Sequence, residues 1–429
     1  MIDTYLSKFR PNVASLLAIA YIFSLSLINQ PVYGKISLSE VIFPFLLVSI
    51  FYHQKVRICI KSFLNPSDFF IFLLVLLLVI YTAIYPNSHT LFNLVTAGYL
   101  FLVGLVFRMF SIADYKGLVT VLILGFSLCG MALVLTGSVG WIWALICKQH
   151  NIWAWYYLDF PYLGDIPRAR GWAGTPEMMA SLLSVSLLLK CLLPKTMELN
   201  SQLLKWAMGI EFVGLFLCFS KTLILLAGIF IFMRAFQYHG TKKVLVFIFG
   251  LLFCFLYLVG TNFIWIKSHN GYIPISSKIA ITKIRTIDKD NYIFSTPYYE
   301  LKRAAILAEK EKGFFFIKGA TFNSWLDHLK FQKKFPENLE SYDPHCTYLG
   351  AFAELGWLGL LIVFGLLVTP ILTCIFPLNG IALTEHRLIL GFSLFFFLLA
   401  FNTDLLHFRH WWIISTGLIQ FLATRHVRA

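Results

Sequence analysis

The sequence predicts an all-α polytopic membrane protein with about twelve transmembrane helices and one large segment outside the membrane. Its composition is the first reason: 59% of the residues are hydrophobic and only 13% are charged, whereas soluble domains carry about 25% charged residues. Mean hydropathy is +0.76. The second reason is a series of apolar stretches, each close to the ~20 residues that a helix needs to cross a bilayer.

These apolar stretches recur along the whole chain. No small-residue cleavage site follows the first of them, so we expect an uncleaved signal-anchor there. Most of the eight cysteines lie inside apolar stretches without zinc or CxxC spacing, and we expect them to act as small hydrophobic residues. The predicted spans are 12–29, 36–53, 69–86, 91–107, 117–137, 177–194, 202–220, 222–237, 244–266, 346–376, 386–405 and 409–425.

Lysine and arginine in the short loops predict the orientation, because cytoplasmic loops carry an excess of both. In the predicted arrangement most of these loops lie on the same side as the two termini, which are therefore expected to be cytoplasmic. The opposite loops 30–35, 87–90 and 405–408 are nearly free of Lys and Arg. The net charge of +14 is mainly explained by the Lys and Arg residues of the predicted cytoplasmic loops. We do not expect nucleic-acid binding, because no compact basic domain is available for it. The loop cations include Lys55, Arg57, Arg108, Lys116, Lys195, Lys205, Arg234, Lys242 and Arg387.

This arrangement divides the chain into five parts. Residues 1–137 hold spans one to five, and 138–176 form an outer loop rich in aromatic and basic residues. Residues 177–266 hold the next four spans, 267–345 form the large outer segment, and 346–429 hold the last three spans.

Three cations on the outer side depart from the loop-charge rule. Arg168 and Arg170 precede Thr175-Pro176, which suits the capped first turn of a helix. A helix N-terminus with arginines nearby can bind an anion, although an ordinary capped helix explains the pattern equally well. Lys221 stands directly against a span with no acidic neighbour in sequence, and an ionisable group in that position indicates a functional role with an anionic partner.

The large outer segment contains a polar helix. We expect it to begin at Thr296-Pro297 and to end at Gly313. It is too polar to span a membrane, so it should lie on the outer surface. Lys302 and Arg303 on this helix could hold a diphosphate through charged N–H donors, or could simply be solvated.

The stretch DPHCTYLGAFAELGWLGL, residues 343–360, places His345 at the start of an apolar helix. Its ordinary pKa near 6.5 makes histidine the natural proton acceptor at neutral pH, although a lone histidine at a membrane boundary is often structural. Asp343 favours an extended approach to the helix, and Glu354 is expected to bond to another helix. Gly356 and Gly359 would allow close packing of that helix.

Polar residues also crowd the last outer turn, in FNTDLLHFRHWW (401–412). The twelve-span arrangement could bring this group beside His345; it consists of Asn402, Asp404, His407, Arg409 and His410. Asp404 and Arg409 could equally form a plain structural ion pair.

Taken in order, these stretches resemble the O-antigen ligase and O-antigen polymerase superfamily of bacterial envelope proteins. The resemblance covers about residues 165–425 and rests on Ser220-Lys221, on Arg303 before a turn at Gly319, on DPHxxYLxxxAELGxxG, and on the final D-x4-R-x2-W. The second of these matches is ambiguous between Lys302 and Arg303. Lys221 departs from the arginine usual in the family, and TPE at 175–177 stands where members often have Pro-Asn.

The resemblance implies a GT-C-like, metal-independent glycosyltransferase without a cofactor, in the inner membrane of a Gram-negative bacterium. The donor would be a glycan on undecaprenyl diphosphate, at the periplasmic face. His345 would be the general base. The diphosphate would be bound by Lys221, Arg303, Arg168, Arg170 or Lys302, with Asp343, Glu354, Asp404 and Arg409 in support.

Two questions stay open at the level of the sequence. A ligase would use lipid A–core as acceptor and a polymerase would use a lipid-linked repeat unit, with the polymerase slightly favoured. A transporter or flippase of lipid-linked oligosaccharide is an alternative of a different class, which Glu211 and Lys205 inside a predicted span would favour.

Overall fold

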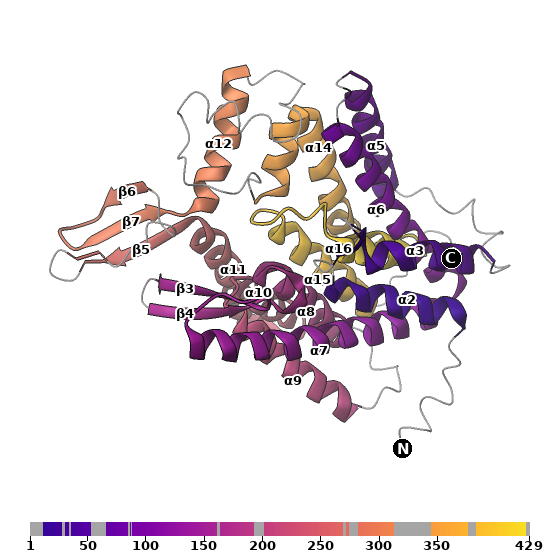
Figure 1. The fold of residues 1–429 in the computed structure, drawn as a ribbon, viewed down its shortest axis with the longest axis horizontal. Helices are drawn as coiled ribbons and strands as arrows, with labels where there is room; N and C mark the ends of the chain where they lie inside the picture. The colour runs from indigo at the N-terminus through magenta and orange to yellow at the C-terminus, as the bar shows by residue number, and fades with distance from the viewer. Residues whose placement is uncertain are drawn as a thin grey trace.

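The computed structural model is mostly helical, with small β-sheets in the two segments predicted to lie outside the membrane and a further strand pair near the N-terminus (Figure 1). It describes residues 12–27, 31–33, 36–52, 66–84, 86, 88–160, 164–192, 201–268, 272–273, 282–312, 345–375 and 383–425. The apolar stretches predicted from the sequence all fall on helices. These helices are α2 (Val13–Ser24), α3 (Leu38–Phe51), α5 (Pro66–Ile84), α6 (Ser88–Ala113), α7 (Tyr115–Cys147), α8 (Pro176–Leu192), α9 (Ser201–Leu217), α10 (Thr222–Ala235), α11 (Gly240–Asn262), α14 (Thr347–Ile375) and α15 (Leu383–Leu399). The last stretch is continuous through α16 (Arg409–Trp412), a π-helical turn (Ile413–Ile419) and α17 (Gln420–Arg425).

Within the described ranges, five helices are long and apolar enough to cross a membrane. They lie at Ser67–Ile84, Leu91–Ala113, Tyr115–Cys147, Gly240–Asn262 and Thr347–Cys374. Three shorter apolar helices lie at Val13–Leu27, Leu38–Phe51 and Thr222–Ala235. The length and composition of these helices therefore identify the chain as a membrane protein. The number of about twelve spans stays a prediction.

Two helices are longer than the sequence analysis expected. The apolar run of α7 continues through Trp141 to Cys147, ten residues into the segment predicted as loop, and Trp141 Nε1 donates to the Pro167 carbonyl at 3.0 Å. Helix α6 likewise continues past Arg108, which is buried and donates to Asp68 of α5 at 2.7 Å. Arg108 is thus part of the helix packing, and the expectation that it is a loop charge was wrong.

Both outer segments contain antiparallel strands that were not predicted. In the first, β3 (Ala154–Phe160) pairs with β4 (Gly164–Ala169), with Trp155 opposite Arg168. In the second, β7 (Asn291–Ser295) lies between β5 (Phe263–Lys267) and β6 (Thr282–Thr286). This sheet projects from the helices at the left of Figure 1. A two-stranded pairing of β1 (Pro31–Tyr33) with β2 (Ile36–Ser37) precedes α3.

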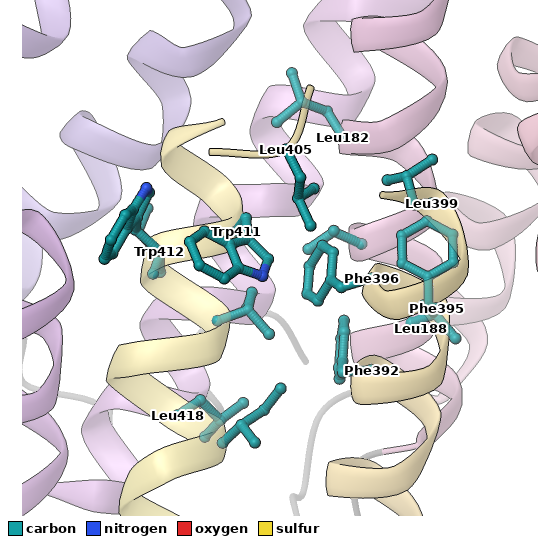
Figure 2. Packing of buried hydrophobic residues seen from close by; sticks show 14 of the residues in the cluster. Leu182, Leu188, Phe392, Phe395, Phe396, Leu399, Leu405, Trp411, Trp412 and Leu418 are labelled. Atoms are coloured by element: carbon teal, nitrogen blue, oxygen red, sulfur yellow. The ribbon is translucent and has the colours of Figure 1, made fainter. Parts of the chain in front are cut away.

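The core is formed by aromatic and aliphatic side chains of helices that are distant in sequence. Figure 2 shows Phe392 and Phe396 of α15 facing the helix that carries Trp411 and Trp412, with Phe395 on the same helix as the other two phenylalanines. All five side chains are almost completely buried. Leu182 and Leu188 of α8 close the same cluster (Figure 2). This packing fixes how the ends of α8, α15 and α16 lie relative to one another.

Helix α12 (Pro297–Lys312) is the polar helix of the large outer segment, and it begins at the predicted Thr296-Pro297. It contacts α14, α11 and β7. Its first turn is held on the end of α11, because Thr296 donates from its backbone N–H to the Asn262 carbonyl at 2.9 Å and from Oγ1 to the Thr261 carbonyl at 2.6 Å. The predicted turn at Gly319 lies outside the described residues.

Candidate active site

His345 lies immediately before α14 in a strained backbone conformation. Its φ of 47° is in the left-handed region, which residues other than glycine rarely adopt. The next turn is held firmly by the loop after α15. The Thr347 backbone N–H donates to the Ala400 carbonyl at 2.8 Å, and its Oγ1 donates to the Thr403 carbonyl at 2.7 Å. Surrounding contacts therefore hold the half-buried His345 imidazole in a defined place.

Tyr298, in the first turn of α12, contacts both His345 and Lys221. Its ring centroid is 5.0 Å from that of the His345 imidazole, with the planes tilted by 56°. The Lys221 ammonium lies 5.5 Å from the centroid of the same ring. The nearby Glu177 carboxylate, together with burial, raises the pKa of the Tyr298 phenol. Sequence analysis did not single out Tyr298, although it directly follows the predicted helix start.

Lys221 occupies the turn between α9 and α10, two residues after Phe219, which also has a positive φ of 44°. The side chain is half-buried, and within the described residues its ammonium makes no hydrogen bond or ion pair. Burial and the positive charges of Arg168 and Lys302 lower the pKa of Lys221 to about 7, against the opposing effect of Glu177. The anionic partner that the sequence suggested is thus not a carboxylate in the described part of the chain.

Arg168 reaches the same place from β4. It donates from Nε to the Cys218 carbonyl at 3.0 Å and forms an ion pair with Glu177 at 2.7 Å. The guanidinium also lies over the Tyr157 ring, 5.4 Å from its centroid. The Thr175 cap predicted for α8 is present, since the Met178 backbone N–H donates to Thr175 Oγ1 at 3.1 Å. Glu177, in the first turn of that helix, was not predicted as a site residue.

Arg170 points elsewhere and stabilises the turn after the hairpin. It donates to the Gly174 carbonyl at 3.0 Å and to the Asn151 carbonyl at 2.9 Å, and it lies over the Trp155 ring. Its contacts are those of a structural residue.

Lys302, rather than Arg303, faces the site. The Lys302 ammonium donates to Asn262 Oδ1 at 2.8 Å and to Asn402 Oδ1 at 2.6 Å, which joins α12 to α11 and to the loop after α15. Burial lowers the pKa of Lys302 to about 8. The side chain of Arg303 is 56% exposed and lies 3.4 Å from Glu300 on its own helix. The ambiguity between these two neighbours is thereby resolved in favour of Lys302.

Asp404 and Arg409 do not pair with each other. Asp404 lies 3.1 Å from His407, and Arg409 pairs with Glu40 at the start of α3. Although burial acts in the opposite direction, His407 and more weakly His345 lower the pKa of Asp404, so this carboxylate lies within electrostatic reach of His345. Arg409 also lies over the Tyr99 ring, 5.7 Å from its centroid. It belongs to a separate polar group.

Glu354 and the two glycines lie further along α14. Glu354 is partly buried, and two residues later Gly356 has φ 71° and ψ −165°, which interrupts the helix. Tyr81 of α5 donates to the adjacent Leu355 carbonyl at 3.3 Å. An added Cβ at Gly359 would meet Leu355 of its own helix. Gly356 therefore lies at a kink of α14, and the expected role of the two glycines in packing against another helix stays a prediction. Asp343 lies outside the described residues.

The structure thus gathers residues from β4, the α9–α10 turn, α12, the start of α14 and the loop after α15. We call Arg168, Lys221 and Lys302 the cation cluster. Tyr298 connects this cluster to His345, and Glu177 and Asp404 are the nearby carboxylates. A histidine able to accept a proton beside fixed cations suits a reaction in which a hydroxyl loses its proton and an anionic group departs.

Comparison with models of known protein families finds no match for this chain. Comparison with curated protein sequences finds no match either.

Proposed function

We propose that this protein is a multi-span membrane glycosyltransferase of the O-antigen polymerase or ligase type, with a GT-C-like architecture. The observation that supports it most strongly is the placement of His345 next to the cation cluster, from segments that are far apart in sequence. Lys221 and His345 both contact the Tyr298 ring, at 5.5 Å and 5.0 Å from its centroid.

In this proposal the donor is a glycan carried by undecaprenyl diphosphate. His345 takes the proton of the acceptor hydroxyl as its oxygen attacks the anomeric carbon from the face opposite the diphosphate. The bond between that carbon and the phosphate oxygen breaks with inversion, and the bonding electrons leave with the lipid diphosphate. Lys221, Arg168 and Lys302 stabilise the negative charge that develops there. The imidazolium then returns its proton to water.

The proposed location is the bacterial inner membrane, with both termini cytoplasmic and the site at the periplasmic face. The acceptor is a lipid-linked repeat unit for a polymerase, or lipid A–core for a ligase.

Complementation of strains that lack either a polymerase or a ligase tests this function. A restored ladder of long chains on lipopolysaccharide gels in the first strain identifies a polymerase, and glycan attached to lipid A–core in the second identifies a ligase. His345→Ala should abolish rescue, since a general base contributes about 10²–10⁴-fold. His239→Ala, an exposed histidine before α11, is the matched control and should rescue normally. Full rescue by His345→Ala would refute the general-base role.

A lipid-linked oligosaccharide flippase is the second candidate, and one observation favours it. Lys190 of α8 and Glu211 of α9 form an ion pair with both side chains fully buried between helices, and buried charges inside spans often mark transport paths. The sequence pointed to Lys205 as the companion of Glu211, but Lys205 is exposed. A flippase would keep its activity in a transport assay with His345→Ala, whereas the transferase would lose its own.

A further inference from the structure

Lys221 differs from the other members of the cation cluster in the groups that contact its charged nitrogen. Arg168 has Glu177 at 2.7 Å and the Cys218 carbonyl at 3.0 Å. Lys302 has two amide oxygens, at 2.8 Å and 2.6 Å. Within the described residues, Lys221 has the Tyr298 ring face and no oxygen acceptor.

The surroundings of Lys221 oppose a permanent positive charge. Arg168 from β4 and Lys302 from α12 repel it, and Glu177 at the start of α8 attracts it but is already paired with Arg168. Within the described residues, Tyr298, whose ring the ammonium contacts, and His345, which contacts the same ring, are further ionisable groups in these surroundings. A lysine can lose its proton in such a place, whereas an arginine cannot, because its pKa stays above about 12 in proteins.

We propose that Lys221 is neutral in the empty site above neutral pH, and that it takes up a proton from water when a diphosphate group binds. The site then binds the anion and one proton together. This inference rests on the proposed function for the identity of the anion as a diphosphate diester.

The direction of the pH dependence follows from the same geometry. In the empty site the pKa of Lys221 is lowered to about 7, and a bound anion raises it by supplying the missing opposite charge. Binding is therefore independent of this proton at pH values below about 6. Above pH 7 the affinity falls as the pH rises, by up to about tenfold per pH unit for a single linked proton.

Titration calorimetry on the full chain in detergent tests the proposal. A dialkyl diphosphate diester is the probe, because it has no proton of its own to exchange near neutrality. Titrations at pH 8 in buffers with different ionisation enthalpies give the number of protons taken up. Lys221 should contribute about 0.9 proton, the fraction of amine that is neutral one pH unit above its pKa, and Lys302, with a pKa of about 8, should add up to about 0.5 proton. Lys221→Arg should bind the probe with an uptake that is smaller by about 0.9 proton.

Two further variants assign the proton. Lys302→Arg and His345→Ala should both keep the proton of about 0.9 that is assigned to Lys221, and its loss in either would assign that proton to the substituted residue and overturn the proposal. Equal uptake by wild type and Lys221→Arg would overturn it as well, and so would absence of binding by the wild type.

A second measurement needs no variant, in case Lys221→Arg fails to fold. The logarithm of the wild-type Kd should be flat below pH 6 and rise with a slope approaching one above pH 7. A flat profile from pH 6 to 9 would contradict the proposal. Neither measurement needs glycosyl transfer. A negative result here therefore does not affect the complementation test, and failed complementation does not affect this proposal.

Discussion

The phenol ring of Tyr298 packs against the imidazole of His345, with centroids 5.0 Å apart, although 47 residues of sequence separate them. The same ring receives the Lys221 ammonium. One aromatic side chain thereby sets the spacing between the histidine and the nearest cation. The start of α12 is in turn fixed to α11 through Thr296, so this spacing is built into the packing of the helices.

Removing the ring should therefore lower activity, while removing the hydroxyl should not. An edge contact between rings contributes about 0.5–1.5 kcal/mol and a cation–π contact about 0.5–2 kcal/mol. Tyr298→Ala should accordingly lose roughly 10- to 100-fold in transfer rate, and Tyr298→Phe should stay within about twofold. Tyr299→Ala, whose ring contacts Phe263 instead, is the neighbouring control. Equal losses in the Ala and Phe variants would show that the hydroxyl, and not the ring, is what matters.

Lys302 and Arg303 should differ sharply in their effect although they are adjacent. Lys302→Ala removes a buried cation bonded to Asn262 and Asn402, and we expect a loss of about 10²-fold or more in transfer, in line with the loss of one stabilising donor. Arg303→Ala removes a half-exposed group with a weak partner, and activity should stay within about twofold. Transfer assays on purified variants measure both, and a larger loss for Arg303→Ala would place Arg303 in the site.

The buried pair of Lys190 and Glu211 should matter for stability as a unit. Lys190→Met leaves the Glu211 carboxylate buried without its cation, so the free energy of unfolding should fall by about 3–5 kcal/mol. The double variant Lys190→Met/Glu211→Leu should recover most of this loss. Lys205→Met, on the exposed side of α9, should change stability by less than about 0.5 kcal/mol. Thermal unfolding in detergent compares the three, and an unaffected Lys190→Met variant would mean that the pair is not buried as described.

Gly356 should tolerate no side chain. Its φ of 71° with ψ of −165° is a backbone conformation essentially restricted to glycine, so Gly356→Ala should destabilise the protein by about 1–3 kcal/mol. It should also impair transfer, because a straightened helix would shift His345. Gly98→Ala is the matched control, since an added Cβ there meets no atom within 4 Å. Wild-type stability and transfer in Gly356→Ala would show that the kink has no role in placing His345.

Much of the helical framework could be predicted from the sequence, because a long apolar run has few alternatives to a helix in a membrane. The Thr175 cap and the start of α12 at Thr296-Pro297 follow from local rules and are confirmed. The strands could not be predicted in the same way. They are short, they lie in segments of mixed polarity, and β6 is exposed along its whole length, so no alternation of buried and exposed residues marks it.

Several residues of the candidate site could be predicted from the sequence, but the side chains and carbonyls that they contact could not. Lys221 and His345 stand out beside apolar runs, and Lys302 stands out on the polar helix. Their partners come from elsewhere in the chain: Lys302 bonds to Asn402, 100 residues away, and Tyr298 carries no motif of its own. Which oxygen or ring a side chain meets depends on how the helices pack, and a charge pattern along one segment does not contain that information.

The length of α7 has a consequence for the lipid around the protein. A helix of 33 residues is about 50 Å long, while the hydrocarbon core of a bilayer is about 30 Å thick. No charged residue interrupts α7 between Lys116 and Lys148, so a bilayer must accommodate it through tilt or local thickening. The β3–β4 hairpin that carries Arg168 follows its far end. A bilayer that tilts or thickens around α7 would therefore also move the hairpin that carries Arg168.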